Sequence, residues 1–467
     1  MLFNSGEFCF IFLPVTLVLF YTAAHWHLTR LAIGILGVAS AIFYVDGTPT
    51  FAGPWGIPVA PYLLLLLGSI MFNYAVGACL RRRASRVGLA LGLAANLSVL
   101  AYFKYANFFL QNLDAWTGAT FSWPGIFLPL GISFYTFQSI AYLADCNEGK
   151  VGRHSMLDFA VFLHFFPQLI AGPIVHHREM LPQFRSLRMF VVNYRNIATG
   201  FTLFTLGLGK KVLIADHFSD WVGDAFQHVT ALSMSGAWAG ALAFGLQLYF
   251  DFSGYTDMAL GLGLLFNVRY PPNFNSPYKA VSLIDFWRRW HMTLSRFLRD
   301  YLYIPLGGNR QGKFRRYVNL LVTMVLGGFW HGAAWTYVIW GAWHGFFLAV
   351  NHTWEERGGK LPVLAGRVLT LLVVLVGWVF FRSSSLGDSV TMLSAMFGGA
   401  HAGETGPRLT EGVWLEVASV VVLFAPNSLE IVARLKPSRT WAWIVVLLFL
   451  LAAYHFDSTT EFLYYQF

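Results

Sequence analysis

Two histidines with tryptophan and glycine neighbours lie in a stretch of the sequence that has no Asp, Glu, Lys or Arg. Residues 317–354 contain no Asp, Glu, Lys or Arg, and they include His331 in GGFWHGAAW and His344 in GAWHG. An ionisable group at membrane depth is costly and is a functional candidate by default. Neutral imidazole is the least costly of these groups, and it can act as a general base toward an attacking hydroxyl.

The glycines around His331 distinguish it from His344. Gly327, Gly328 and Gly332 leave room for a ligand or another backbone to approach the ring closely. We therefore predict a catalytic role for His331. For His344 we expect a structural role, in which the ring is hydrogen-bonded to a neighbouring helix.

A third histidine follows a run of tryptophans and arginines. The stretch 285–300, DFWRRWHMTLSRFLRD, predicts one amphipathic helix at the membrane interface, with an apolar face opposite its arginines. His291 lies among these arginines, and nearby positive charge disfavours a protonated imidazole. Because a neutral imidazole can act as a general base, His291 is the second catalytic candidate.

Two carboxylates lie beside apolar stretches, in LQLYFDFSGYTDMALGLG. Asp251 and Asp257 need partners if they are buried, and Arg288 or Arg289 could supply the positive charge. We favour a structural ion pair over a catalytic role for these carboxylates.

The remaining polar groups give weaker signals. Lys210 and Lys211 could extend to the cytoplasmic interface or bind a phosphorylated donor. His176 and His177 have no acidic or cysteine partner at metal-ligand spacing, so we predict no metal site. The 3 cysteines fit neither a disulfide framework nor a zinc site.

Membrane-spanning helices must hold all of these side chains in place. Hydrophobic residues make up 56% of the chain and charged residues 12%, whereas a soluble domain has about 25% charged residues. Crossing a bilayer takes roughly 20 apolar residues, so we predict an all-α polytopic membrane protein with about 11 to 13 transmembrane helices. Residues 1–467 are treated as a single membrane-embedded domain.

The expected spans follow from hydropathy. They lie near 8–24, 31–45, 60–80, 88–106, 126–142, 196–215, 236–250, 317–334, 335–352, 368–382, 413–427 and 440–456. The first span is expected to be retained, because MLFNSGEF has no basic residue of the kind a cleaved signal needs. We expect re-entrant or irregular backbone at 157–172, where Pro167 would interrupt a helix, and at 254–266. Such backbone suggests a tunnel.

The net charge of +9 is distributed in a way that argues against nucleic-acid binding. Lys and Arg are absent from 31–80, 105–149, 212–268 and 440–467 and gather in the loops between them. The positive-inside rule then places the basic loops in the cytoplasm. The polar stretches 46–59, 107–125 and 217–235 would lie outside.

Two long runs carry a family resemblance. They are FNSPYKAVSLIDFWRRWHMTLSRFLRDYLYIPLGGNR (274–310) and GGFWHGAAWTYVIWGAWHG (327–345). Together they resemble the membrane-bound O-acyltransferase family, above all the branch of the alginate O-acetyltransferase membrane subunit and related cellulose and exopolysaccharide acetylases. Further similar stretches lie at 128–145, 165–174, 207–216 and 249–263, so the resemblance covers a core motif region of 128–352.

The resemblance implies a transmembrane acyl-transfer enzyme built around a central tunnel. The two histidines of the family motifs fall on His331 and His291. The donor, acetyl-CoA or another acetyl thioester, would be a substrate that approaches from the cytoplasm, with no tightly bound cofactor. Candidates for lining the tunnel or contacting the donor are Trp330, Gly332, Trp287, Arg288, Arg289, Asp251 and Asn309.

The resemblance also implies a location and partners. We expect a multi-pass protein of the bacterial inner membrane, in contact with its lipids, that works with periplasmic acetyltransferase proteins and a polysaccharide synthase complex, and not with nucleic acid. The acceptor stays open between alginate, cellulose and another exopolysaccharide. The alternative function is a transporter or flippase for a polysaccharide or lipid-linked sugar, in which His331 only lines the path.

Overall fold

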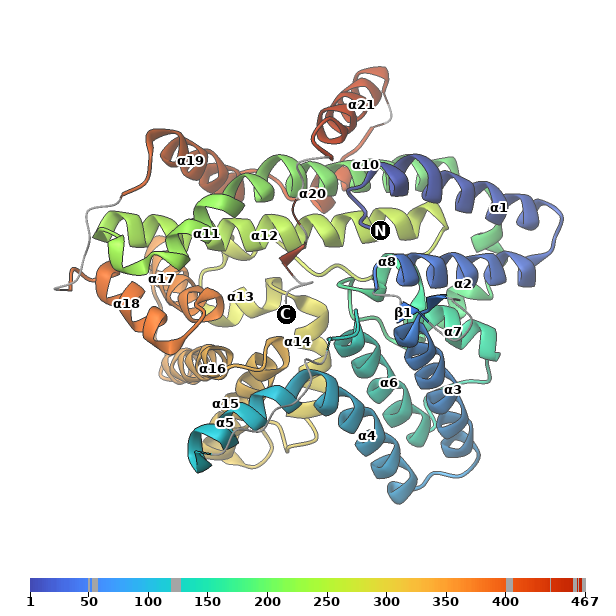
Figure 1. Ribbon diagram of the computed structural model, residues 1–467, viewed down its shortest axis with the longest axis horizontal. Helices are drawn as coiled ribbons and strands as arrows, with labels where there is room; N and C mark the ends of the chain where they lie inside the picture. The colour runs from blue at the N-terminus through green and yellow to red at the C-terminus, as the bar shows by residue number, and fades with distance from the viewer. Residues whose placement is uncertain are drawn as a thin grey trace. The chain divides into compact units, whose positions relative to one another are not determined.

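The described part of the chain is mainly helical (Figure 1). The structure is a computed structural model that describes residues 1–48, 51–52, 58–118, 127–399, 406–436, 438–456, 460 and 462–463. The strands in this part of the chain are two residues long, β1 (Phe51–Ala52) and β2 (Pro58–Val59), and they pair antiparallel. The predicted all-α polytopic membrane protein is confirmed.

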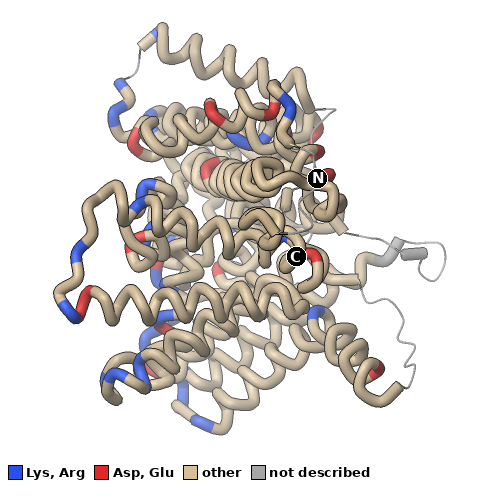
Figure 2. The backbone as a smooth tube through the Cα atoms, turned by 90° about the vertical axis from the view of Figure 1, so that its left-hand side faces the viewer, with Lys and Arg blue, Asp and Glu red and all other residues tan. Residues whose placement is uncertain are grey.

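Hydropathy located the helices well. Every predicted span overlaps a helix of the structure. Within the described residues, 6 helical stretches are long and apolar enough to cross a membrane, and α21 (Arg439–Ala453) is a shorter apolar helix. The six are Phe8–His25, Thr29–Asp46, Pro61–Arg82, Arg86–Thr117, Tyr194–Gln227 and Val363–Arg382. Lys and Arg lie mostly near helix ends and in connecting loops (Figure 2), whereas the side of the membrane on which each loop lies stays a prediction.

The chain divides into two compact units. Unit 1 comprises Met1–Thr205, Thr256–Pro271 and Val445–Glu461, and unit 2 comprises Leu206–Tyr255, Pro272–Ile444 and Phe462–Phe467. The predicted motif region, 128–352, contributes residues to both units.

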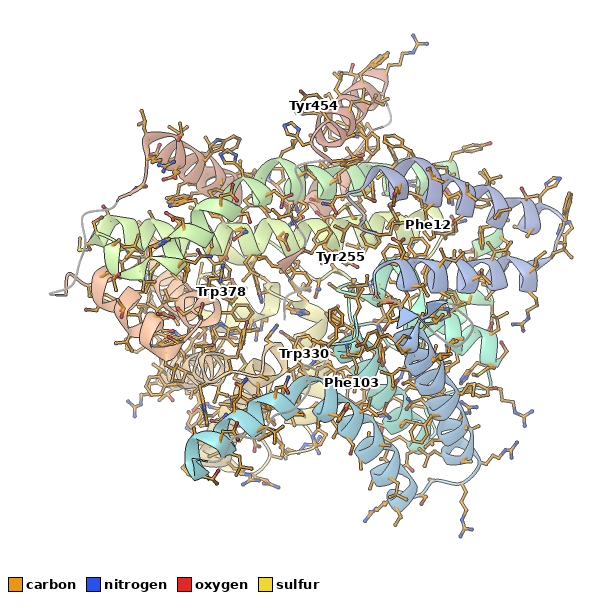
Figure 3. The ribbon with its side chains drawn as sticks, viewed as in Figure 1. Phe12, Phe103, Tyr255, Trp330, Trp378 and Tyr454 are labelled. Atoms are coloured by element: carbon orange, nitrogen blue, oxygen red, sulfur yellow. The ribbon has the colours of Figure 1, made fainter. Side chains whose placement is uncertain are left out.

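Unit 1 contains the N-terminal helices and an interrupted segment. Its helices include α1 (Leu13–His25), α2 (Thr29–Asp46), α3 (Pro61–Arg82), α4 (Arg86–Leu100), α5 (Ala106–Thr117) and α6 (Ile132–Asn147). Phe12 packs edge-on against Phe166, with ring centroids 5.3 Å apart (Figure 3).

The interrupted segment of unit 1 lies at the predicted position. Helix α7 (Met156–His164) ends before Phe165, which is not helical, and α8 (Phe166–Leu169) follows with Pro167 in its first turn. Proline is tolerated there because the first turn needs no amide donor. The prediction that 157–172 does not form one continuous helix is therefore confirmed.

The prediction of irregular backbone at 254–266 is wrong. Residues 254–265 lie within α12 (Met234–Leu265) without a break, and Phe266 follows the end of this helix. The glycines instead allow close helix packing against α10 (Tyr194–Gly209): a Cβ on Gly261 would lie 2.5 Å from the Gly200 carbonyl oxygen, and one on Gly254 would lie 2.7 Å from that of Gly207. Small residues commonly serve this purpose in membrane helices.

Unit 2 is built around the predicted helical hairpin. Helices α15 (Gly312–His331) and α16 (Trp335–Glu356) pack together and are followed by α17 (Val363–Arg382) and α18 (Leu386–Met396). Its other helices include α11 (Ser219–Gln227), α19 (Leu409–Phe424) and α20 (Ser428–Ala433). Trp378 of α17 lies in the core, its ring 5.0 Å from Trp290 and 6.0 Å from Trp340 (Figure 3).

The glycines on either side of His331 allow the two helices of the hairpin to pack closely. A Cβ on Gly328 would collide with the Tyr337 carbonyl oxygen, and one on Gly332 would collide with the Tyr337 ring. We expected these glycines to allow close approach of either a ligand or another backbone. In the hairpin they allow close approach of another part of the chain.

Candidate active site

The predicted amphipathic helix is broken at His291. Helix α13 (Leu283–Arg289) and helix α14 (Met292–Leu298) are separated by Trp290 and by His291, which has a left-handed φ of 43°. The preceding loop holds this break, because the Asn275 amide donates to the Arg289 carbonyl and the Met292 amide donates to that of Asn273. The prediction of one continuous helix over 285–300 is wrong for this reason.

The apolar face predicted for that helix is nevertheless buried. Its four members, 0–4% exposed, are Phe286, Trp290, Leu294 and Phe297. The break therefore changes the direction of the chain while keeping these side chains in the core.

Asn273 fixes the protonation pattern of the His291 ring. The amide and hydroxyl of Thr293 both lie within donating distance of Asn273 Oδ1, at 3.2 and 2.9 Å. A backbone N–H can only donate, so this atom is an oxygen, and His291 Nδ1, 3.1 Å away, must donate to it as well. Nε2 then carries the lone pair.

The neutral form of this ring is favoured by a different cause from the one we predicted. His291 lies outside the predicted spans, between 236–250 and 317–334 in the sequence, and is fully buried, and this burial lowers its pKa. The predicted neutral state is consistent with this direction, but the cause is burial and not the neighbouring arginines.

His331 lies at the end of α15, 4% exposed and surrounded by rings. Its centroid is 4.8 Å from Trp330, 5.4 Å from Trp340 and 5.2 Å from Phe381. The centroid of His291 is 6.2 Å away. Two histidines predicted from separate motifs thus lie next to each other.

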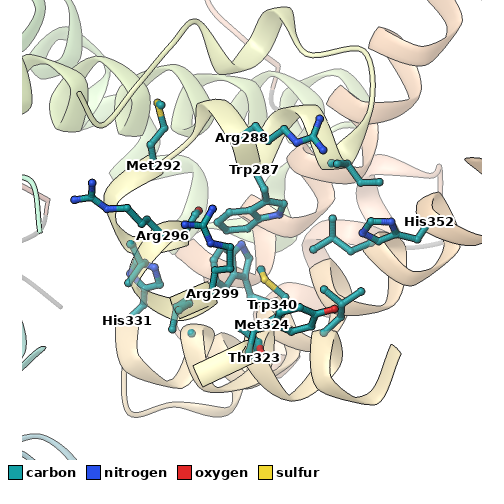
Figure 4. Close-up of a pocket in the computed structure, with 18 residues that line it drawn as sticks. Trp287, Arg288, Met292, Arg296, Arg299, Thr323, Met324, His331, Trp340 and His352 are labelled. Carbon is teal, nitrogen blue, oxygen red and sulfur yellow. The ribbon is translucent and has the colours of Figure 1, made fainter. Parts of the chain in front are cut away.

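A cavity of about 620 Å³ in unit 2 reaches His331. It is lined by α13, α14 and the following turn on one side and by the hairpin on the other. His331 and Arg296 lie on one side of the view, Arg288 and His352 on the other, with Trp287 and Trp340 between them (Figure 4). The further lining residues include Met292, Ser295, Arg299, Thr323, Met324 and Leu348.

Only some of the predicted tunnel residues line this cavity. Trp287 and Arg288 do, in addition to His331. Arg289 instead pairs with Asp285 at 2.8 Å, and Asn309 is exposed in the turn at the end of the first motif run. The structure does not bring these two residues to the cavity.

Trp330 and Gly332 also lie outside the lining. Trp330 is 5% exposed, and its ring centroid is 6.3 Å from that of His291, so it packs beside both histidines. Gly332 faces Tyr337, as described above.

Asp251 is in a structural ion cluster away from the cavity lining. Its Oδ1 is 2.7 Å from Lys211 Nζ, which also lies 2.8 Å from Asp216 Oδ1. The expected kind of interaction, a structural ion pair, is present, but the proposed partners Arg288 and Arg289 are wrong. Lys211 is 1% exposed, so this cluster, and not a phosphorylated donor, accounts for its charge.

His344 also departs from expectation. It is fully buried, and neither ring nitrogen has a hydrogen-bond partner among the described residues. The ring packs instead beside Trp340 and Trp287, at 5.0 and 5.3 Å, and against Gly377 of α17. The predicted hydrogen bond to a neighbouring helix is wrong, because the ring is held by aromatic packing.

Sequence reasoning missed Asn273 and His352. Asn273 lies just before the motif run that starts at Phe274, and no spacing rule connects it to His291. His352 falls in the charge-free stretch, where we singled out only His331 and His344. The absence of charged residues around His352 could have identified it as a third candidate in this stretch.

The comparison with known proteins agrees with this geometry. A model of the membrane-bound O-acyltransferase family matches residues 89–357. The chain is 42% identical over 432 residues to the "Peptidoglycan O-acetyltransferase" of Helicobacter pylori, a match that covers 85% of this chain and 80% of the relative. It is 43% identical over 410 residues to the "Probable alginate O-acetylase AlgI" of Pseudomonas aeruginosa, covering 85% and 75%.

A more distant relative is named for the transfer of a different acyl group, D-alanyl. The "Teichoic acid D-alanyltransferase" of Streptococcus thermophilus is 30% identical over 242 residues, covering 49% of this chain and 58% of the relative. The family match and the two O-acetyltransferase relatives confirm the resemblance first seen in the motif runs. This multi-pass membrane protein therefore belongs to the membrane-bound O-acyltransferase family and is an O-acyltransferase.

Proposed function

We propose that the enzyme takes acetyl groups from a cytoplasmic thioester and passes them across the bacterial inner membrane for O-acetylation of an exported polysaccharide. The observation that carries this proposal is the cavity that joins His331 to Arg288. A thioester of the coenzyme A type has an acyl end and a phosphate end, and this cavity offers an imidazole to the first and a guanidinium to the second. Membership of an O-acyltransferase family favours this function over transport.

The proposed chemistry moves the acetyl group from sulfur to oxygen. His331 takes the proton of the acceptor hydroxyl as its oxygen attacks the thioester carbonyl. The tetrahedral intermediate then expels the thiolate, which receives the proton from the imidazolium of His331. The products are an O-acetyl ester and a free thiol, and His331 returns to its neutral form.

The acceptor is expected to be a polymer of the cell envelope. The two O-acetyltransferase relatives are named for peptidoglycan and alginate, and cellulose is a further candidate for this chain. We propose that a periplasmic partner completes the transfer to the sugar. In a cell lacking the enzyme, polymer should still be exported but without acetyl groups, as measured by acetyl content of the secreted polymer. Failure of export itself would support the transporter alternative.

Arg288 is expected to bind the donor. Its guanidinium lines the cavity and has no ion pair among the described residues. Arg288→Gln should raise the KM for the donor roughly tenfold or more, because a charge-assisted hydrogen bond contributes about 1.5–3 kcal/mol. Arg289→Gln is the matched control, since the neighbouring arginine pairs with Asp285 and does not line the cavity. Equal KM values for the two variants would contradict this role.

Asn273 is expected to position His291 without touching substrate. Asn273→Ala removes the acceptor that keeps the proton on Nδ1 of His291. We expect kcat to fall by a factor of roughly 5 to 150, corresponding to about 1–3 kcal/mol for a lost buried hydrogen bond, with the KM for the donor unchanged.

The control for this variant is another buried asparagine. Asn319 is 2% exposed and donates to the Gly308 carbonyl, away from both histidines. Asn319→Ala should lower stability without a comparable fall in kcat. If both variants lose kcat to the same extent in steady-state assays, Asn273 is only structural.

A further inference from the structure

Unit 1 contains two adjoining cavities that are separate from the proposed active site. The first, of about 490 Å³, is lined by seven polar residues and one methionine, namely Gln183, Ser186, Arg188, Met189, Asn193, Asn196, Asn267 and Arg269. The second, of about 610 Å³, is lined mainly by apolar side chains, namely Leu187, Val191, Val192 and Tyr194, with Arg188, Asn193 and Arg195. Arg188 and Asn193 line both. A polar chamber thus opens beside an apolar one.

The polar cavity has a preformed wall. Asn267 adopts a left-handed φ of 58°, and its side-chain amide donates to the carbonyls of Met189 and Val191 at 3.1 and 2.8 Å. Its Oδ1 accepts from the Asn196 side chain at 2.8 Å. A non-glycine residue in this conformation is uncommon and is held only when its surroundings fix it. The asparagine amides therefore shape the wall.

The arginines that line the two cavities have no carboxylate partner among the described residues. The guanidinium groups of Arg188, Arg195 and Arg269 form no ion pair in the part of the chain that the structure describes. Neither cavity has a carboxylate in its lining. Helix α10 begins beside them, with the Asn196 amide donating to Asn193 Oδ1 at 3.1 Å, and its N-terminal end adds partial positive charge. These features fit a phosphate.

The apolar cavity has the opposite character. Leu187 is 75% exposed, Val191 62% and Tyr194 82%, although all three are apolar or aromatic. Exposed apolar side chains beside arginines are typical of a segment that lies at a membrane surface. Lipid acyl chains would cover these side chains.

We propose that these two cavities bind one anionic phospholipid of the surrounding membrane. The phosphate would lie between Arg188 and Arg269, and the first part of an acyl chain would contact Leu187, Val191 and Tyr194. A soluble phosphate compound would satisfy the arginines but would leave the apolar cavity uncovered. A phospholipid would pair its phosphate with the arginines and cover the apolar cavity with an acyl chain.

The test is lipid binding by the full-length enzyme, measured by native mass spectrometry after titration with phosphatidylglycerol or phosphatidylcholine. We expect preferential binding of phosphatidylglycerol, and about tenfold weaker binding in the double variant R188Q/R269Q, as for loss of charge-assisted contacts to a phosphate. The matched control R83Q/R86Q removes the same charge from exposed arginines that line neither cavity, and it should bind like the native enzyme.

Further measurements distinguish a lipid phosphate from a soluble phosphate compound as the ligand. L187S/V191S should weaken phosphatidylglycerol binding while leaving the folded protein intact in a thermal melt. Glycerol phosphate and inorganic phosphate, added at millimolar concentration, should not displace the lipid. Displacement by either compound, or unchanged lipid binding in R188Q/R269Q, would overturn the proposal.

Discussion

Replacing His331 with alanine is expected to reduce acyl transfer by at least about 100-fold, because a positioned general base contributes roughly 10²–10⁴-fold. The imidazole is the group of the cavity lining that can accept a proton from an attacking hydroxyl at the proposed acyl end. The measurement is the acetyl content of the polymer made in cells, together with transfer by purified enzyme.

A buried histidine elsewhere provides the control for this variant. His164 of α7 is also 4% exposed, but its Nε2 lies 3.0 Å from the Gly37 carbonyl in unit 1. His164→Ala should lower the amount of folded protein without lowering the activity per folded molecule. Normal activity per molecule in His331→Ala would refute the general-base role.

Replacing Lys211 with methionine is expected to lower the free energy of unfolding by about 3–5 kcal/mol, because it leaves buried carboxylates without their cation. Asp251 is 2% exposed, and its Oδ2 also accepts from the Leu463 amide at 3.1 Å. Denaturant titration in detergent micelles measures the change.

A second substitution tests the electrostatic cause of this loss. The double variant Lys211→Met with Asp251→Leu should recover part of the stability, since replacing both members of a buried pair with apolar residues is often neutral or better. Lys210→Met, at the neighbouring position, controls for loss of a lysine from the same turn and should cost less. Equal losses in the two single lysine variants would contradict the ion-cluster explanation.

The sequence predicted the helices because hydropathy is a local property. Continuous apolar stretches such as 60–80 correspond to helices such as α3, and the charge-free stretch 317–354 became the predicted hairpin. Proline at 167 also marked a real interruption. Glycine was a poorer guide, because it can either break a helix or let two helices approach, and in α12 it does the second.

The sequence could not predict contacts between distant segments. The break at His291 depends on two backbone hydrogen bonds, one donated by the Asn275 amide and one accepted by the Asn273 carbonyl, which no helical periodicity encodes. Lys211 and Asp251 are 40 positions apart, and nothing in the spacing favours Lys211 over Arg288 as the partner. Arg288 lines the cavity, whereas Arg289 pairs with Asp285 on the same helix. The end of α13 at Arg289 was not foreseen either.

The catalytic candidates were identified from motif runs, and the structure adds their proximity. His291 and His331 come from different runs, and their ring centroids lie 6.2 Å apart. The cavity then adds Arg296, Arg299 and His352 to the residues near the proposed reaction. These three residues reach the cavity because of the way α13, α14 and the hairpin pack, which the sequence alone does not show.

The most direct test is a cryo-electron microscopy structure of the enzyme with an analogue of S-acetyl phosphopantetheine in which an amide replaces the thioester. This analogue carries the part common to acetyl-CoA and to acetylated carrier proteins. We predict that it occupies the cavity, with its acetyl carbonyl beside His331 and its phosphate toward Arg288. An analogue bound elsewhere, with the His331 ring enclosed by Trp330, Trp340 and Phe381, would contradict the proposed reaction site.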